Sequence, residues 1–265
     1  MFTLDKRPLK DFGIEVINFG SLPLFPEVRD RTITVPGRAG TYFYGTDLGA
    51  KTFTHQCGFI WADSEFELAR LAREFKDFVT DAYGRPRKML LIYDHEPDKY
   101  YEVRLTGDHS MEKAWSLGYF TLNMVADNPM AKSVFTSNQI TLGSDVPIMS
   151  DILLGTGESS RKVFREGSFI VTNSGSSAVR LSCVISGSGN SVALEANGRR
   201  FTLGSFTNKT IAIDGENYLV KVDGVADLTN TGGHFIDLLP GENEIYVSGS
   251  SLNLTISDSL RYDYV

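Results

Sequence analysis

Hydrophobic positions in the first half of the chain follow a helical period after residue 64. Ser64 and Glu67 have the spacing of a capping box, in which a hydroxyl and a carboxylate satisfy free backbone N–H groups at a helix start. The apolar positions that then share one helical face are Leu68, Leu71, Ala72, Phe75, Phe78 and Val79. Gly84 and Pro86 supply a glycine stop and a barrier to continuation. The pattern predicts one helix that covers one face of a sheet.

Short apolar segments around this helix are typical of strands. The expected strands of the first half are residues 31–35, 51–61, 88–93, 100–105 and 118–126, with an acidic turn at 94–98 and a glycine-rich turn at 36–40.

The second half has period two, with apolar residues at every second position of 179–185, 218–222 and 252–256. This period gives each strand one buried face and favours antiparallel sheets packed face to face. Asn197-Gly198 predicts a two-residue hairpin turn, because both central residues must tolerate positive φ. Further turn signals stand at Gly187-Ser188-Gly189, Asp214-Gly215, Asp223-Gly224 and Pro240-Gly241. We interpret this half as a β-sandwich of jelly-roll type.

The chain length of 265 residues exceeds that of a typical single domain and favours two. We therefore expect a mainly β protein with an N-terminal β-rich domain over residues 1–133 and a C-terminal β-sandwich over 134–265. The connection falls near 128–140, at the start of a weakly patterned stretch that runs to about 167.

The charge distribution argues against sequence-specific nucleic-acid binding. Residues 1–133 carry 17 Lys and Arg against 19 Asp and Glu, and residues 134–265 carry 9 against 14. Neither half has the basic patch that phosphate binding requires. The apolar runs are too short for a membrane anchor, and the first residues lack the layout of a signal peptide. We expect synthesis in the cytoplasm, with export only within a larger particle.

Candidate chemistry is sparse. Cys57 and Cys183 are expected to be buried free thiols. The acidic cluster at residues 94–98 contains possible metal ligands but lies on an expected solvated turn, and the histidines lack zinc-site spacing. No nucleophile elbow, phosphate loop or dinucleotide fingerprint occurs. We therefore expect no catalytic residues, no cofactor and no metal, although a carboxylate pair for glycoside hydrolysis is set by spacing in three dimensions.

Carbohydrate binding is an alternative function, because jelly rolls often serve as lectins. Both tryptophans, Trp61 and Trp115, fall in the first half, so the sandwich offers no tryptophan platform. Its aromatic residues are expected mostly in the core; examples are Phe201, Phe206, Tyr218, Phe235 and Tyr246.

Two segments resemble parts of the distal tail proteins of siphophages. In residues 33–45 a strand ends in Pro-Gly-Arg, and a glycine turn leads into aromatic residues. Residues 238–245 resemble the Leu-x-Pro-Gly-x-Asn turn of that family's second domain. The order of the expected elements matches along nearly the whole chain, and the departures lie around 138–167 and in the last four residues.

The resemblance implies a structural role in a virion. Distal tail proteins have an N-terminal belt domain that forms a hexameric ring and a C-terminal galectin-like β-sandwich. The ring surrounds the DNA exit channel and joins the tail tube protein to the tail-tip protein, with receptor-binding proteins as further partners. The resemblance implies no enzyme activity and no cofactor. A β-rich scaffold of a contractile injection machine is a further alternative.

Arg38, Tyr42, Phe43 and Tyr44 are the candidate subunit-interface residues. Successive side chains of a strand point to opposite faces, so three consecutive rings cannot all be buried in one sheet. Exposed aromatic residues beside an arginine are typical interface anchors. The alternative is that these residues pack inside their own domain around a hairpin.

Overall fold

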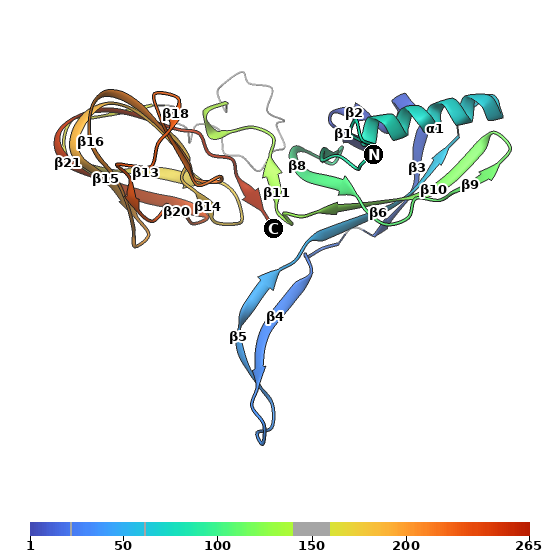
Figure 1. Cartoon of the computed structure of the whole chain (residues 1–265), viewed down its shortest axis with the longest axis horizontal. Coiled ribbons are helices and arrows are strands. Elements are labelled where there is room, and N and C mark those ends of the chain that lie inside the picture. The colour runs from blue at the N-terminus through green and yellow to red at the C-terminus, as the bar shows by residue number, and fades with distance from the viewer. Residues whose placement is uncertain (22, 61, 140–159) are drawn as a thin grey trace. The chain divides into compact units, whose positions relative to one another are not determined.

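The computed structural model describes residues 1–139 and 160–265, except residues 22 and 61. The chain divides into two compact units, Met1–Ala131 and Lys132–Val265. Both are built mainly from antiparallel strands, and the described residues contain one α-helix (Figure 1). The mainly β fold class with a single helix is therefore confirmed, whereas residues 140–159, the centre of the weakly patterned stretch, lie outside the described chain.

The first unit combines one sheet, one helix and one separate hairpin. Its elements are β1 (Phe2–Leu4), β2 (Arg7–Pro8), η1 (Leu9–Phe12), β3 (Ile14–Ser21), β4 (Val28–Thr34), β5 (Thr41–Leu48), β6 (Lys51–Phe59), α1 (Glu65–Val79), β7 (Met89–Tyr93), β8 (Glu96–Leu105), β9 (Met111–Ala114) and β10 (Leu117–Ala126). The sheet has the order β2-β1-β7-β8-β10-β6-β3, and β9 pairs with β10.

Helix α1 lies over one face of this sheet (Figure 1). Leu68, Leu71, Phe75 and Val79 from its apolar stripe are buried in a core that also contains strand residues such as Leu122. The alternating burial of β7 and β8 places their inward side chains in the same core. The predicted helical period is therefore confirmed by the face that α1 buries.

The ends of α1 agree with the sequence only at the N-terminus. The Ser64 hydroxyl accepts a hydrogen bond from the Glu67 N–H at 3.2 Å, as predicted. The Glu67 carboxylate reaches back one residue further than expected, to the Asp63 N–H at 3.0 Å. At the C-terminus the helix stops at Thr80, whose backbone is extended. The expected glycine stop is wrong, because Gly84 lies beyond this point in a separate turn.

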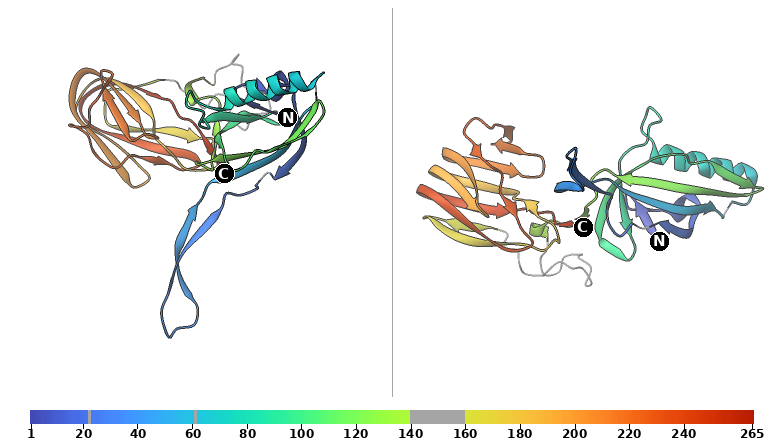
Figure 2. Two further views of the ribbon diagram at one scale, coloured as in Figure 1. Left: turned by 45° about the vertical axis from the view of Figure 1, so that its right-hand side comes forward. Right: turned by 90° about the horizontal axis from the view of Figure 1, so that it is seen from below.

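The second unit is a curled sheet with long central strands (Figure 2). Its elements are β11 (Ala131–Ser133, which begins at the last residue of the first unit), η2 (Ser137–Gln139), β12 (Arg161–Val163), β13 (Gly167–Asn173), β14 (Val179–Arg180), β15 (Cys183–Ala196), β16 (Arg199–Asp214), β17 (Leu219–Val222), β18 (Val225–Ala226), β19 (Gly232–Gly233), β20 (Asp237–Leu238), β21 (Gly241–Asp258) and β22 (Asp263–Tyr264).

The main sheet of this unit has the order β12-β21-β15-β16-β17-β18, and β13 pairs with β21. Register shifts between Gly187 and Ala193 interrupt the pairing of β15 with both neighbours. Such bulges bend strands, so inward residues from both halves of β15, such as Ile185 and Leu194, are buried. Asn197-Gly198 forms the predicted two-residue turn, with φ of 50° and 73°.

Other sequence-based expectations have mixed outcomes. Cys57 and Cys183 are free and buried, as expected. Tyr218 was expected to share the inward face of a strand with Val220, but it precedes β17, has a φ of 53° and is more than half exposed. No helix among the described residues is long and apolar enough to span a membrane.

Candidate functional site: the β4–β5 ribbon

The candidate interface residues lie on a two-stranded ribbon formed by β4 and β5 (residues 28–48). These strands pair with each other and with no other strand in the described part of the chain. The ribbon leaves the sheet after β3 and returns into β6, and these two strands are themselves neighbours. At about 3.4 Å per residue it is roughly 25 Å long, and Figures 1 and 2 show it extending away from the sheet of its own unit.

Both faces of the ribbon are exposed. Every residue of β4 is exposed, and so is every residue of β5 except Gly45. Its exposed large apolar side chains are Val28, Ile33, Val35, Tyr42, Phe43, Tyr44 and Leu48. An isolated two-stranded hairpin is marginally stable in water, and exposed apolar patches mark interaction surfaces. The ribbon therefore has the properties of a segment that packs against a partner.

The end of the ribbon is a tight turn. Pro36 and Gly37 occupy its centre, and the Arg38 N–H donates to the Val35 carbonyl at 3.2 Å. Gly37 has a φ of 81°, which a type II turn requires at its third residue and glycine adopts without strain. The tight-turn interpretation of this glycine-rich segment is confirmed.

A β-bulge sets the direction of the aromatic side chains. Arg31 is paired with Gly45 and Thr32 with Phe43, so Tyr44 is an extra residue in β5. A bulge interrupts the strict alternation of faces and re-aims the side chains beside it. Phe43 and Tyr44 are 63 % and 66 % exposed, and Tyr42 is 43 % exposed. The prediction that at least one ring is exposed is confirmed, and the alternative of packing inside the domain does not fit these exposures.

Arg38 has a partner within the ribbon. Its guanidinium carbon lies 4.2 Å from the centre of the Tyr42 ring, a cation–π contact. Along the strands, Arg31 pairs with Asp47 and the Thr46 hydroxyl donates to Asp30 at 3.0 Å. Because these charges are neutralised locally, the surface left for a partner is mainly apolar and aromatic.

The other candidate sites carry no comparable arrangement. The acidic turn is tight, and Asp94 pairs with the N-terminal amine at 3.3 Å. Asp98, expected on a solvated turn, is instead buried in β8. No group of three or more His, Cys, Asp or Glu able to hold a metal occurs in the part of the chain that the structure describes.

The aromatic residues of the second unit are divided between core and surface. Phe201 and Phe206 are buried as expected, whereas Tyr218 and Tyr246 are exposed. The Tyr218 ring is covered by the Arg180 guanidinium at 4.4 Å and meets Phe235 edge-on at 5.3 Å. Arg180 therefore covers one face of the Tyr218 ring, and the expectation that Tyr218 lies in the core is wrong because more than half of the residue is exposed.

Comparison with known proteins shows which folds this chain resembles. Residues 7–126, which include the ribbon, match the family model of the phage tail protein RIFT-related domain. The crystal structure of the SPP1 Dit protein (gp 19.1), described as a paradigm of the hub adsorption apparatus in phages that infect Gram-positive bacteria, is similar to this chain with a TM-score of 0.71. The identity is 14 %, and the match covers 98 % of each chain. The chain has the fold of a siphophage distal tail protein.

A chain of the phage P2 baseplate, in its activated conformation with Ca, also matches, with a TM-score of 0.41, 12 % identity and coverage of 91 % of this chain and 92 % of that one. No curated protein sequence matches the chain. The resemblance to distal tail proteins that the two sequence segments indicated is confirmed.

Proposed function

We propose that this chain is a structural protein of the distal end of a siphophage tail. In this role it forms a homo-hexameric ring around the DNA exit channel and joins the tail tube protein to the tail-tip protein of the host-adhesion apparatus. Its place is the tail tip of the virion after synthesis in the host cytoplasm. The RIFT-related domain over residues 7–126 and the fold shared with SPP1 Dit support this proposal.

The ribbon is the observation that carries the proposal. A closed ring of identical subunits uses head-to-tail contacts, so each copy presents a surface that differs from the surface it contacts on its neighbour. The β4–β5 ribbon extends from its own unit and exposes aromatic residues on both faces. In the proposed assembly, Arg38, Tyr42, Phe43 and Tyr44 contact a neighbouring subunit or the tail tube.

The two units have separate roles in this proposal. Residues 1–133 supply the ring-forming belt domain, and residues 134–265 supply a galectin-like sandwich that acts as a spacer or docking module for peripheral tail proteins. The absence of tryptophan from residues 134–265 supports a docking role over carbohydrate binding, because sugar platforms favour large, rigid aromatic rings. The proposed role of both units is structural rather than catalytic.

The mass of the purified full chain in solution tests the proposal. We expect a hexamer, or a monomer that becomes a hexamer as the protein concentration rises. A particle of any other closed stoichiometry, or a monomer that also fails to bind purified tail tube protein, would contradict it.

A further inference from the structure

Trp115 occupies an unusual backbone position. The register of β9 and β10 pairs Ala114 with Leu117, so Trp115 and Ser116 form a two-residue hairpin turn. Trp115 has a φ of 55°, at the first central position of the turn, where glycine is the usual residue. A bulky side chain rarely adopts this left-handed conformation, and here the side chain is also 74 % exposed.

In the described part of the chain, Trp115 lacks the ring and cation contacts that another residue with a similar backbone conformation, Tyr218, makes. Tyr218 has a similar φ of 53°, but its ring contacts Arg180 and Phe235 of its own unit. No ring or cation contact is present for Trp115 among the described residues. The strained conformation therefore presents a large apolar ring to solvent, without a ring or cation contact from the described part of its own chain.

An apolar pocket large enough for an aromatic ring lies between α1 and the sheet of the same unit. Its volume is about 500 Å³, and apolar side chains from the helix and the strands line it, among them Phe75, Phe120 and Leu122. Pockets that hold a bound group are typically about 300–1,000 Å³ and mostly apolar, with few polar atoms. This pocket can therefore accept an aromatic side chain of about the size of an indole.

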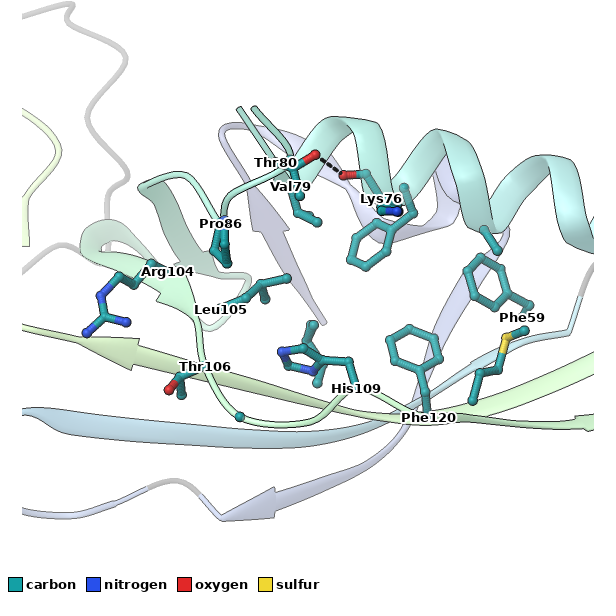
Figure 3. Close-up of a pocket in the computed structure, with 16 residues that line it drawn as sticks. Phe59, Lys76, Val79, Thr80, Pro86, Arg104, Leu105, Thr106, His109 and Phe120 are labelled. Carbon is teal, nitrogen blue, oxygen red and sulfur yellow. Dashed lines mark hydrogen bonds between the residues drawn. The ribbon is translucent and has the colours of Figure 1, made fainter. Parts of the chain in front are cut away.

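His109 lines the pocket but presents no open hydrogen-bonding atom to it. Figure 3 shows its ring between Leu105 and Phe120, inside the pocket. Its Nδ1 lies 3.1 Å from the carbonyl oxygen of Thr121, which can only accept, so Nδ1 carries the proton. In the neutral ring Nε2 is then an acceptor, and this buried atom has no hydrogen-bond partner. Because less than 1 Å² of Nε2 is accessible, the surface that an occupant meets is mainly apolar and aromatic, and an apolar ring fits it.

Charge at the two surfaces is complementary. Lys76 lines the pocket and forms no ion pair with a described residue. Glu112, three residues before Trp115, is exposed and likewise forms no ion pair within the described chain. A contact that brings the tip of the β9–β10 hairpin to the pocket therefore places opposite, unpaired charges at its edge.

We propose that Trp115 of one copy of this chain inserts into the pocket beneath α1 of a second copy. Within one chain, Met111 lines the pocket while Trp115 lies four residues further along the hairpin, about 13 Å away. Insertion therefore joins different surfaces of two copies, head to tail. This contact is additional to the ribbon contact and rests on the proposed self-assembly.

Tryptophan fluorescence of the full chain tests the insertion. The sequence contains two tryptophans, so Trp61→Phe leaves Trp115 as the only indole. We expect its emission to shift to shorter wavelength as the copies associate with rising concentration. The same shift is expected with Phe164→Ala in this background, since Phe164 is an exposed ring of the other unit. An emission maximum of an exposed indole at every concentration overturns the proposal, whether the protein is an oligomer or a monomer.

Sedimentation of three variants tests whether Trp115 lies against His109, which lines the pocket. Trp115→Ala should weaken self-association at least about tenfold, and His109→Leu about three- to tenfold. Because both remove one contact, the double variant should be no weaker than Trp115→Ala alone. Effects that multiply overturn the pairing and point to another occupant of the pocket, such as a different tail protein.

Trp115→Gly keeps the test independent of folding defects. Glycine relieves the left-handed backbone, so the melting temperature of the monomer should rise by about 2–4 °C while association is lost. A lower melting temperature would mean that Trp115 serves its own domain. If Tyr42→Ala/Tyr44→Ala abolishes assembly while Trp115 stays exposed in the wild-type oligomer, this inference fails and the proposed function stands.

Discussion

Replacing Tyr42 and Tyr44 by alanine removes two exposed rings from the ribbon without touching the core of the first unit. Tyr42 is 43 % exposed and Tyr44 is 66 % exposed, so together they present about the surface of one whole aromatic side chain, roughly 200 Å². At ~25 cal/mol per Å² the upper bound for their burial at an interface is about 5 kcal/mol.

The expected loss of binding free energy is smaller than this bound. Alanine retains part of the surface, and interface burial is seldom complete. We therefore expect the double variant to lose about 2–3 kcal/mol of binding free energy at each subunit interface, which is a 30- to 150-fold weaker association. The monomer should lose only the Arg38–Tyr42 contact, worth about 0.5–1 kcal/mol at an exposed site. The double variant should therefore remain folded.

Sedimentation equilibrium measures the association, and thermal unfolding monitored by circular dichroism measures the fold. Phe66→Ala is a matched control, because Phe66 is an exposed ring of the same unit on the outer side of α1. Unchanged association of the double variant would refute the role of the ribbon. Loss of folding without a selective defect in association would show instead that the rings stabilise their own domain.

Burial lowers the pKa of His55 to about 4, from 6.5 in an unfolded chain. Between these values the unfolded state binds more protons, so the free energy of unfolding should fall by up to about 3 kcal/mol as the pH drops from 6.5 to 4. Denaturant titrations of His55→Gln should show a flatter dependence of this free energy on pH. An unchanged dependence would show that His55 is not the group that titrates. Burial also raises the pKa of both Cys57 and Cys183 to about 12. Neither thiol should therefore react with a disulfide reagent at pH 8 until the protein unfolds. Rapid labelling of the native protein would show instead that the thiols become exposed to solvent without unfolding. Residues 1–131 expressed alone should form the ring. If this N-terminal fragment is a monomer and the C-terminal fragment forms an oligomer, the second unit rather than the first forms the ring. The second half should bind glycans only weakly, because it lacks tryptophan and carries a net charge of −5, and a saturable low-micromolar dissociation constant on a glycan panel would favour the lectin alternative.

Local patterns in the sequence determined the features that depend on neighbouring residues. The period of Leu68, Leu71 and Phe75 defines a helix with one apolar face, whatever that face meets. The positive φ tolerated by Asn197-Gly198 selects a hairpin turn. Pro36-Gly37 encodes its turn in the same way, and the segment around it carried the resemblance to distal tail proteins.

Features that depend on distant parts of the chain appeared only in the tertiary structure. Residues 31–35 have the composition of an ordinary strand, and nothing local indicates that β4 and β5 leave the sheet with both faces exposed. The bulge at Tyr44 depends on pairing between strands, and α1 ends where the extended Thr80 pairs with Pro86 rather than at Gly84. The pocket joins α1 to strands far apart in sequence, so neither its lining by His109 nor the exposure of Trp115 has a local signal. A sequence pattern reports which side chains avoid water, whereas the partner that covers them is decided by the arrangement of the whole fold.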